Sequence, residues 1–152
     1  MADSEKVQAV SLLNKILEQE LAGVVRYTHY SFLVFGHGRI PIVSWLRAQA
    51  DESLLHAHKA GEMITHLGAY PSLAIGPLLD SHRLQIGAIL REALETEQRA
   101  LELYRALLIV VSGQSVMLEE YARQMICAEE LHAGEVEKML RQPGGITQLP
   151  EA

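Results

Sequence analysis

The chain of 152 residues contains a single cysteine, Cys127, which has no partner for an intramolecular disulfide. One thiolate also excludes zinc and iron–sulfur sites built from cysteines, because such sites need several of these ligands. This cysteine usage suits a reducing compartment, and the N-terminus has neither an apolar run nor a cleavage signal. We therefore expect a cytoplasmic protein.

Long hydrophobic runs and an excess of basic residues are lacking as well. No stretch reaches the roughly 18 continuous apolar residues of a membrane span, so no membrane partner is expected. Lys and Arg together number 13, against 19 Asp and Glu, which gives a formal net charge of −6. Nucleic-acid binding requires basic side chains that neutralise phosphates, so no nucleic-acid partner is expected either.

Strand signals are nearly absent, and helix-breaking residues gather at four places, in residues 36–41, 68–80, 112–115 and 143–150. Between these places, apolar residues recur every three or four positions, which is the period of an α-helix. Four such segments in one small domain predict an all-α four-helix bundle. We expect the bundle to span residues 5–141 and a short non-helical tail to occupy residues 142–152.

The lengths of the links predict how the helices are connected. The links at 36–41 and 112–115 are short, and short links join antiparallel neighbours. The first and second helices, and the third and fourth, should therefore form two hairpins. The link at 68–80 is long enough to be a crossover between the second and third helices.

Each predicted helix carries acidic or histidine side chains on a stripe that is otherwise apolar. The fourth helix has a Glu-x-x-His pair on this stripe, and one of the two residues in the second helix, Glu52, lies toward the edge. An unpaired buried carboxylate costs several kcal/mol or takes up a proton, so these exceptions indicate function. The six residues are Glu20, Glu52, His56, Glu97, Glu129 and His132.

The two halves of the chain repeat one pattern. Three residues recur 77 positions later: Glu20 as Glu97, Tyr27 as Tyr104, and Glu52 as Glu129. An inward tyrosine near a carboxylate is often plain packing, with its hydroxyl bonded to that carboxylate. In a metal site, Tyr27 and Tyr104 would instead orient the ligands.

Four carboxylates and two imidazoles that face one another predict a site for two metal ions. Oxygen and nitrogen ligands suit iron in both oxidation states, which favours iron over manganese or zinc. Taken singly, an inward Glu is more often partly exposed, and an inward His is more often a core residue with satisfied hydrogen bonds; the six together favour the metal. Five further histidines fall off the stripes or in links and are interpreted as surface residues: His29, His37, His58, His66 and His82.

Three runs resemble the bacterioferritins, a branch of the ferritin superfamily: residues 18–27, 51–57 and 127–132. The similarity spans about residues 10 to 140. It implies a ferritin-like bundle that holds two iron ions per chain and oxidises Fe(II) to Fe(III) with oxygen or peroxide, in a homo-oligomer that is a dimer or a larger shell. The metal ligands that it implies are Glu20, His56, Glu97, Glu129 and His132.

The chain departs from the bacterioferritins at three points. Ser53 stands where the family has the Glu of a Glu-x-x-His motif, with Glu52 one residue earlier. A one-residue π-bulge would turn Glu52 onto the site, and the 77-residue repeat also favours Glu52. Leu54 replaces the methionine by which the family binds haem, which argues against haem. After Arg141, the sequence lacks the fifth short helix of bacterioferritin cages.

Two alternative functions stay open. The first is a di-iron peroxidase or oxidase of the rubrerythrin type, with the same ligands. Rubrerythrins normally carry a rubredoxin module with four cysteines, whereas this chain has one. The second is a non-catalytic helical assembly module, in which a polar core fixes the register of the helices and no metal is bound.

Overall fold

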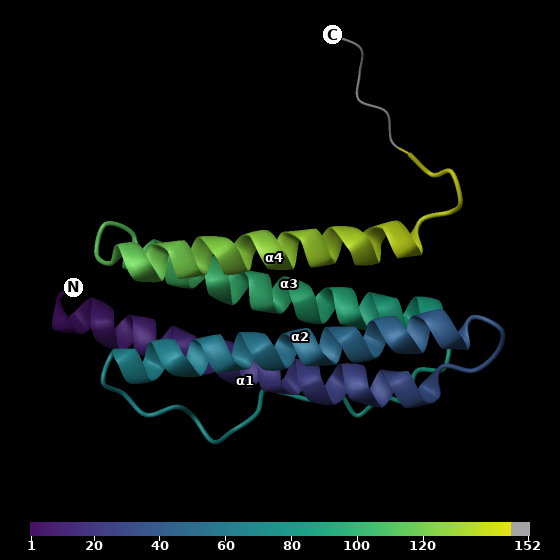
Figure 1. The fold of residues 1–152 in the computed structure, drawn as a ribbon, viewed down its shortest axis with the longest axis horizontal. Helices are drawn as coiled ribbons and strands as arrows, with labels where there is room; N and C mark the ends of the chain where they lie inside the picture. The colour runs from purple at the N-terminus through teal and green to yellow at the C-terminus, as the bar shows by residue number, and fades with distance from the viewer. Residues whose placement is uncertain (147–152) are drawn as a thin grey trace, which may run out of the picture.

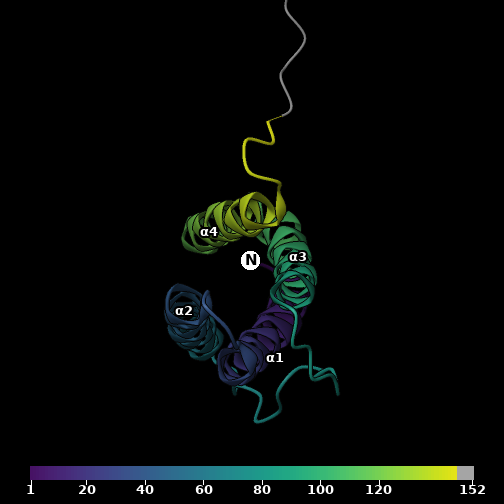
Figure 2. The same cartoon turned by 90° about the vertical axis from the view of Figure 1, so that its right-hand side faces the viewer.

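Four α-helices make up the bundle in the computed structural model, which describes residues 1–146. The helices are α1 (Asp3–Leu33), α2 (Arg39–His66), α3 (Ile86–Val111) and α4 (Val116–Leu140), and they lie alongside one another (Figure 1). Viewed down the bundle, they follow the order α2, α1, α3, α4 (Figure 2), with packing of α1 on α2, α1 on α3 and α3 on α4. The predicted four-helix bundle is confirmed.

Short turns join α1 to α2 and α3 to α4, as predicted. Gly36 and Gly113 lie in these turns with φ angles of 93° and 73°. Glycine adopts this left-handed conformation without a steric penalty, and so it lets the chain reverse direction. Pro41 belongs to the first turn of α2 rather than to the link, because a proline there removes no helical hydrogen bond.

The crossover between α2 and α3 covers residues 67–85 and runs along the length of the bundle (Figure 1). The backbone N–H of Ser72 donates to Asn14 Oδ1 over 2.7 Å, and that of Gly76 donates to the Glu18 carbonyl, also over 2.7 Å. A Cβ at residue 76 would lie 3.0 Å from that carbonyl oxygen, so the close approach needs glycine. These contacts confirm the predicted crossover. The predicted link ends at residue 80, whereas the observed crossover continues for five more residues, to residue 85.

The chain after α4 is non-helical up to residue 146, and residues 1–146 contain no fifth helix. The predicted tail at 142–152 continues into residues 147–152, which lie outside the described residues. In the described part of the chain, none of the helices combines the length and the hydropathy needed to span a membrane.

Two apolar clusters fill the bundle, one on each side of its middle. Leu13 and Leu107 are fully buried in the first cluster, and Leu46 and Ile89 are fully buried in the second. Burial of each such side chain contributes about 1.5–3 kcal/mol to folding, so the clusters hold the helices in register. The predicted polar residues lie between the two clusters.

Candidate metal centre

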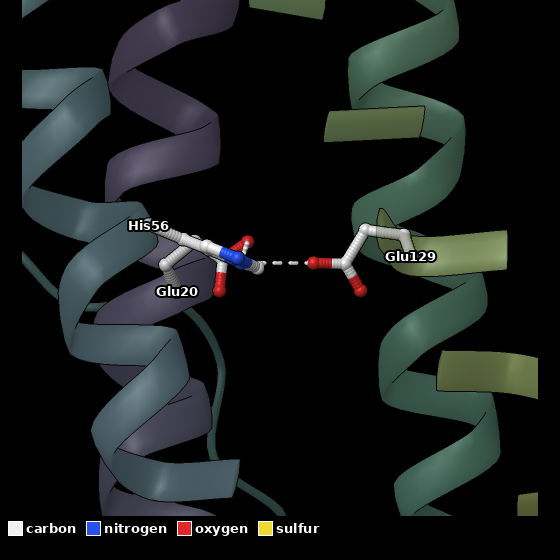
Figure 3. Close-up of side chains that lie close together, drawn as sticks. All are labelled: Glu20, His56 and Glu129. Atoms are coloured by element: carbon white, nitrogen blue, oxygen red, sulfur yellow. Dashed lines mark ion pairs between the residues drawn. The ribbon is translucent and has the colours of Figure 1, made fainter. Parts of the chain in front are cut away.

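Helices α1, α2 and α4 bring Glu20, His56 and Glu129 together in the middle of the bundle. The Nδ1 atom of His56 lies 3.0 Å from Glu129 Oε1 and 3.4 Å from Glu20 Oε1. Figure 3 shows the Glu129 carboxylate facing the other two side chains from across the bundle. All three side chains are buried, and one ligand atom of each lies within 4.8 Å of the others.

A second group of three adjoins the first. Glu97 of α3 and His132 of α4 meet Glu129, again with one ligand atom of each within 4.8 Å of the others. The Nδ1 atom of His132 is 3.9 Å from Glu97 Oε2. Glu129 belongs to both groups, so the five residues form two adjoining positions that share one carboxylate.

Glu52 lies behind the two histidines rather than between them. Its Oε1 is 3.6 Å from His56 Nε2 and its Oε2 is 3.1 Å from His132 Nε2, while the Nδ1 atoms of both histidines face the inner acids. The Glu52 side chain is 39% exposed. Residues 52–56 are α-helical throughout, without the π-bulge suggested by the sequence, and Glu52 reaches the histidines from the edge of α2.

Ser53, the other candidate in α2, is buried and faces α1. Its Oγ lies 2.9 Å from the position that a Cβ on Gly23 would take. Ser53 is absent from both groups of potential ligands. Its small side chain lets the two helices approach closely.

Two tyrosines hold carboxylates of the site in place. The hydroxyl of Tyr104 donates to Glu20 Oε1 over 2.8 Å, and that of Tyr27 donates to Glu97 Oε1. The ring of Tyr27 packs edge-on against Tyr30 at a centroid distance of 6.4 Å. Each tyrosine is fixed within one of the apolar clusters, so both carboxylates are oriented from well-packed parts of the core.

Burial shifts the protonation of the inner residues. It raises the pKa of Glu97 well above that of an ordinary carboxyl group, and the neighbouring Glu129 raises it further. It also raises the pKa of Glu20, against the opposing effect of His56. For His56, burial lowers the pKa, but hydrogen bonds to Glu129 and Glu20 outweigh it and bring the pKa to about 10. All three shifts therefore favour the protonated forms of these residues.

The site fits a bound cation. Glu129 is 1% exposed, and its Oε2 atom has no hydrogen-bond partner among the described residues. A buried carboxylate oxygen without a partner is unfavourable unless a positive charge compensates it. The available atoms are carboxylate oxygens and imidazole nitrogens, the ligands that iron accepts in both oxidation states.

Two other acidic residues near the site, one on α3 and one on α4, lie at the surface. Glu95 is exposed and accepts a hydrogen bond from Arg99, and Glu130 is exposed and accepts one from Arg105. The two groups of potential ligands are the only such groups of three or more among residues 1–146.

Two features of the neighbourhood were missed by the sequence analysis. Arg26 is buried and bonds Thr96 Oγ1 over 2.6 Å and the Pro77 carbonyl. His29 and His82 contact one another although 53 residues separate them. No local sequence pattern predicts either contact, because both depend on the path of the crossover.

The comparisons with known proteins agree with this architecture. The profile of the ferritin-like domain family matches residues 10–144, and the chain belongs to this family. No curated protein matches the sequence.

Solved structures share the fold at low sequence identity. A structure of ferritin-like, diiron-carboxylate proteins from Bacillus anthracis strain Ames is 21% identical over 93% of this chain and 100% of its own, with a TM-score of 0.84. The bacterioferritin of Rhodobacter capsulatus is 21% identical over 88% of this chain and 84% of its own, with a TM-score of 0.78. A Dps1 variant from Mycobacterium smegmatis is 17% identical over 93% of this chain and 100% of its own, with a TM-score of 0.79.

Proposed function

We propose that the protein binds two iron ions per chain between its helices and oxidises Fe(II) to Fe(III), as a ferroxidase of the bacterioferritin-like branch. The observation that carries this proposal is Glu129, a buried carboxylate that is shared by two groups of potential ligands and has one unpaired oxygen. Glu129 would be the carboxylate that helps to hold both ions of a di-iron bundle site. In a non-catalytic assembly module, nothing would compensate this buried carboxylate oxygen, which has no hydrogen-bond partner among the described residues.

The proposed ligands divide between two positions. Glu20 and His56 serve the first, Glu97 and His132 serve the second, and Glu129 serves both. Each histidine would bind through Nδ1, because that atom faces the acids. Glu52 is the sixth residue of the proposed site; in the observed geometry its carboxylate faces the Nε2 atoms of His56 and His132, and direct ligation requires this carboxylate to move inward.

Iron bound there supplies one-electron chemistry, with oxygen or peroxide as the electron acceptor. The residues of the chain control the protons that iron displaces. The pKa of His56 is raised to about 10 in the metal-free site, and burial raises the pKa of Glu97 well above its ordinary value, so both shifts favour the protonated forms. Both must lose their protons to become ligands, so metal binding releases protons and strengthens as the pH rises.

The remaining parts of the proposal concern partners and location. We propose a cytoplasmic role in iron storage or homeostasis and a homo-oligomer, either a dimer or a larger shell. The Rhodobacter capsulatus bacterioferritin contains haem iron. For this chain we expect no haem, because Leu54 occupies the position of the methionine ligand. The purified protein should then lack a Soret absorption band.

Replacement of a proposed ligand tests the function. His132→Ala should lower the rate of Fe(II) oxidation by at least about tenfold, as expected when a direct metal ligand is lost. The fold should survive, because His132 is only half-buried and lies outside both apolar clusters. Glu130→Ala is the matched control, since Glu130 lies on the same helix but contacts Arg105 at the surface. An unchanged oxidation rate in His132→Ala would exclude His132 from the proposed ligands.

A further inference from the structure

A pair of histidines lies near the end of the crossover, away from the candidate metal centre in the sequence. His29 of α1 and His82 of the crossover point ring nitrogens at one another, with Nε2 of His29 and Nδ1 of His82 3.2 Å apart. Their ring centroids are 5.2 Å apart and their planes are inclined by 53°. The two imidazoles are therefore neither stacked nor coplanar.

This spacing is the one that two imidazoles adopt on a single metal ion. Metal–nitrogen bonds of about 2.0–2.1 Å at angles of about 90–110° place two nitrogens about 2.9–3.4 Å apart. A cavity of about 160 Å³ adjoins the pair, lined in part by Val25, Tyr30 and Leu79. A cavity of this size has room for an ion together with several waters that complete its coordination.

The charges around the pair limit which cation fits. Arg26 lines the same cavity, but its guanidinium bonds Thr96 and the Pro77 carbonyl. Arg83 is paired with Glu92 at 3.0 Å. Neither His29 nor His82 contacts a carboxylate within ion-pair distance among residues 1–146. A site with only nitrogen ligands disfavours Ca²⁺ and Mg²⁺, which require oxygen ligands.

We propose that His29 and His82 form a binding site for a divalent transition-metal cation that prefers imidazole ligands, such as Ni²⁺, Cu²⁺ or Zn²⁺. The bound cation ties the last part of the crossover to α1. Among residues 1–146, the other hydrogen bonds between the crossover and α1 reach only as far as residue 77, and Glu92 of α3 bonds Ser81 and Arg83. The site is separate from the proposed di-iron centre and shares no residue with it.

Titration of the metal-free protein with Ni²⁺ tests this proposal. Wild type should bind one more Ni²⁺ per chain than His29→Gln or His82→Gln, or bind that ion at least about tenfold more tightly than either variant. His66→Gln is the matched control, because His66 is exposed on α2, and it should bind Ni²⁺ as wild type does. Ni²⁺ that binds at the candidate metal centre around Glu129 should bind wild type and all three variants alike. The difference in Ni²⁺ binding between wild type and the variants therefore measures binding at the histidine pair alone.

Trypsin cleavage after Arg83 gives a local readout. Ni²⁺ should slow this cleavage in wild type and in His66→Gln, and have a smaller effect in His29→Gln and His82→Gln. Equal Ni²⁺ binding in all four proteins, or equal protection of Arg83, would overturn the proposal and leave only the contact between the two imidazoles. Such a failure leaves the proposed iron site intact, because the variants change none of its residues.

Discussion

Tyr104 donates a hydrogen bond of 2.8 Å to Glu20, so a residue of the second hairpin holds a carboxylate of the first. Tyr27 makes the converse contact with Glu97, from the first hairpin to the second. Because both pairs are related by the 77-residue repeat, the two halves exchange equivalent contacts across the middle of the bundle. The same contacts that join the hairpins therefore orient proposed iron ligands.

Tyr104→Phe removes the hydroxyl that orients Glu20 and leaves the ring in its apolar cluster. We expect iron affinity or oxidation rate to fall by about 10-fold or more, as for other groups that orient metal ligands. The free energy of unfolding of the metal-free protein should fall by about 1–3 kcal/mol, because Glu20 loses a buried hydrogen bond. Tyr121→Phe is the control, since the buried Tyr121 hydroxyl has no hydrogen-bond partner among the described residues. Equal effects of the two substitutions would show that the hydroxyl of Tyr104 has no special role.

Two substitutions of Glu52 distinguish a direct ligand from a residue that positions the histidines. Glu52→Gln keeps one acceptor oxygen, which can face His132 Nε2, whereas Glu52→Ala removes both oxygens. The observed geometry predicts that the Gln variant keeps most of the iron affinity and that the Ala variant loses about 10-fold or more. Ser53→Ala should bind iron as wild type does. An equally large loss of iron in Glu52→Gln and Glu52→Ala would instead indicate direct ligation.

The sequence predicts the helices well because their apolar period and the clustered breakers are local properties. It also picks out Glu20 and Glu97, since each interrupts an apolar stripe. The position of Glu52 depends on more than its register, because its long side chain reaches two histidines from the edge of α2. The contact between His29 and His82 depends on the path of the crossover, which composition does not specify.

Glu97→Gln tests whether protonation balances the buried charge. The raised pKa of Glu97 means that its contribution to stability is complete below the ordinary carboxyl pKa and is lost as the pH rises through the raised value. The melting temperature of the metal-free wild type should therefore fall as the pH rises above about 5. The Gln variant should show a smaller fall, because it remains neutral.

Iron should also raise the melting temperature of Glu97→Gln less than that of wild type. Fe(II) at about 100 times Kd stabilises the wild type by roughly 2.7 kcal/mol, or about 5–10 °C in melting temperature for a chain of this size. This rise should be much smaller in Glu97→Gln, which lacks a proposed ligand. A parallel pH dependence of both metal-free proteins, with the full iron-induced rise in the variant, would remove Glu97 from the site.

Glu92→Gln tests how the crossover is held. Glu92 accepts hydrogen bonds from Tyr30 at 2.7 Å, Ser81 at 2.9 Å and Arg83 at 3.0 Å. Burial acts to raise the pKa of Glu92, but these donors outweigh burial and lower it. Its stabilisation is therefore present above the ordinary carboxyl pKa and lost as the pH falls through the lowered value.

Denaturant unfolding should show a deficit of about 1–3 kcal/mol for Glu92→Gln at neutral pH, and a smaller deficit below about pH 4. Glu95→Gln, which loses only an exposed pair with Arg99, should differ from wild type by less than about 1 kcal/mol at both pH values. A deficit for Glu92→Gln that is equal at both pH values would show that its charge does not hold the crossover.

Anaerobic titration of the metal-free protein with Fe(II), followed by elemental analysis after removal of free iron, measures the central property of the proposed site. We predict two tightly bound ions per chain in wild type and in Glu130→Ala. Because Glu129 is shared by both groups, Glu129→Ala should weaken both positions and retain fewer than one ion per chain. Wild type that retains no iron, or Glu129→Ala that retains two ions as wild type does, would contradict a di-iron centre bridged by Glu129.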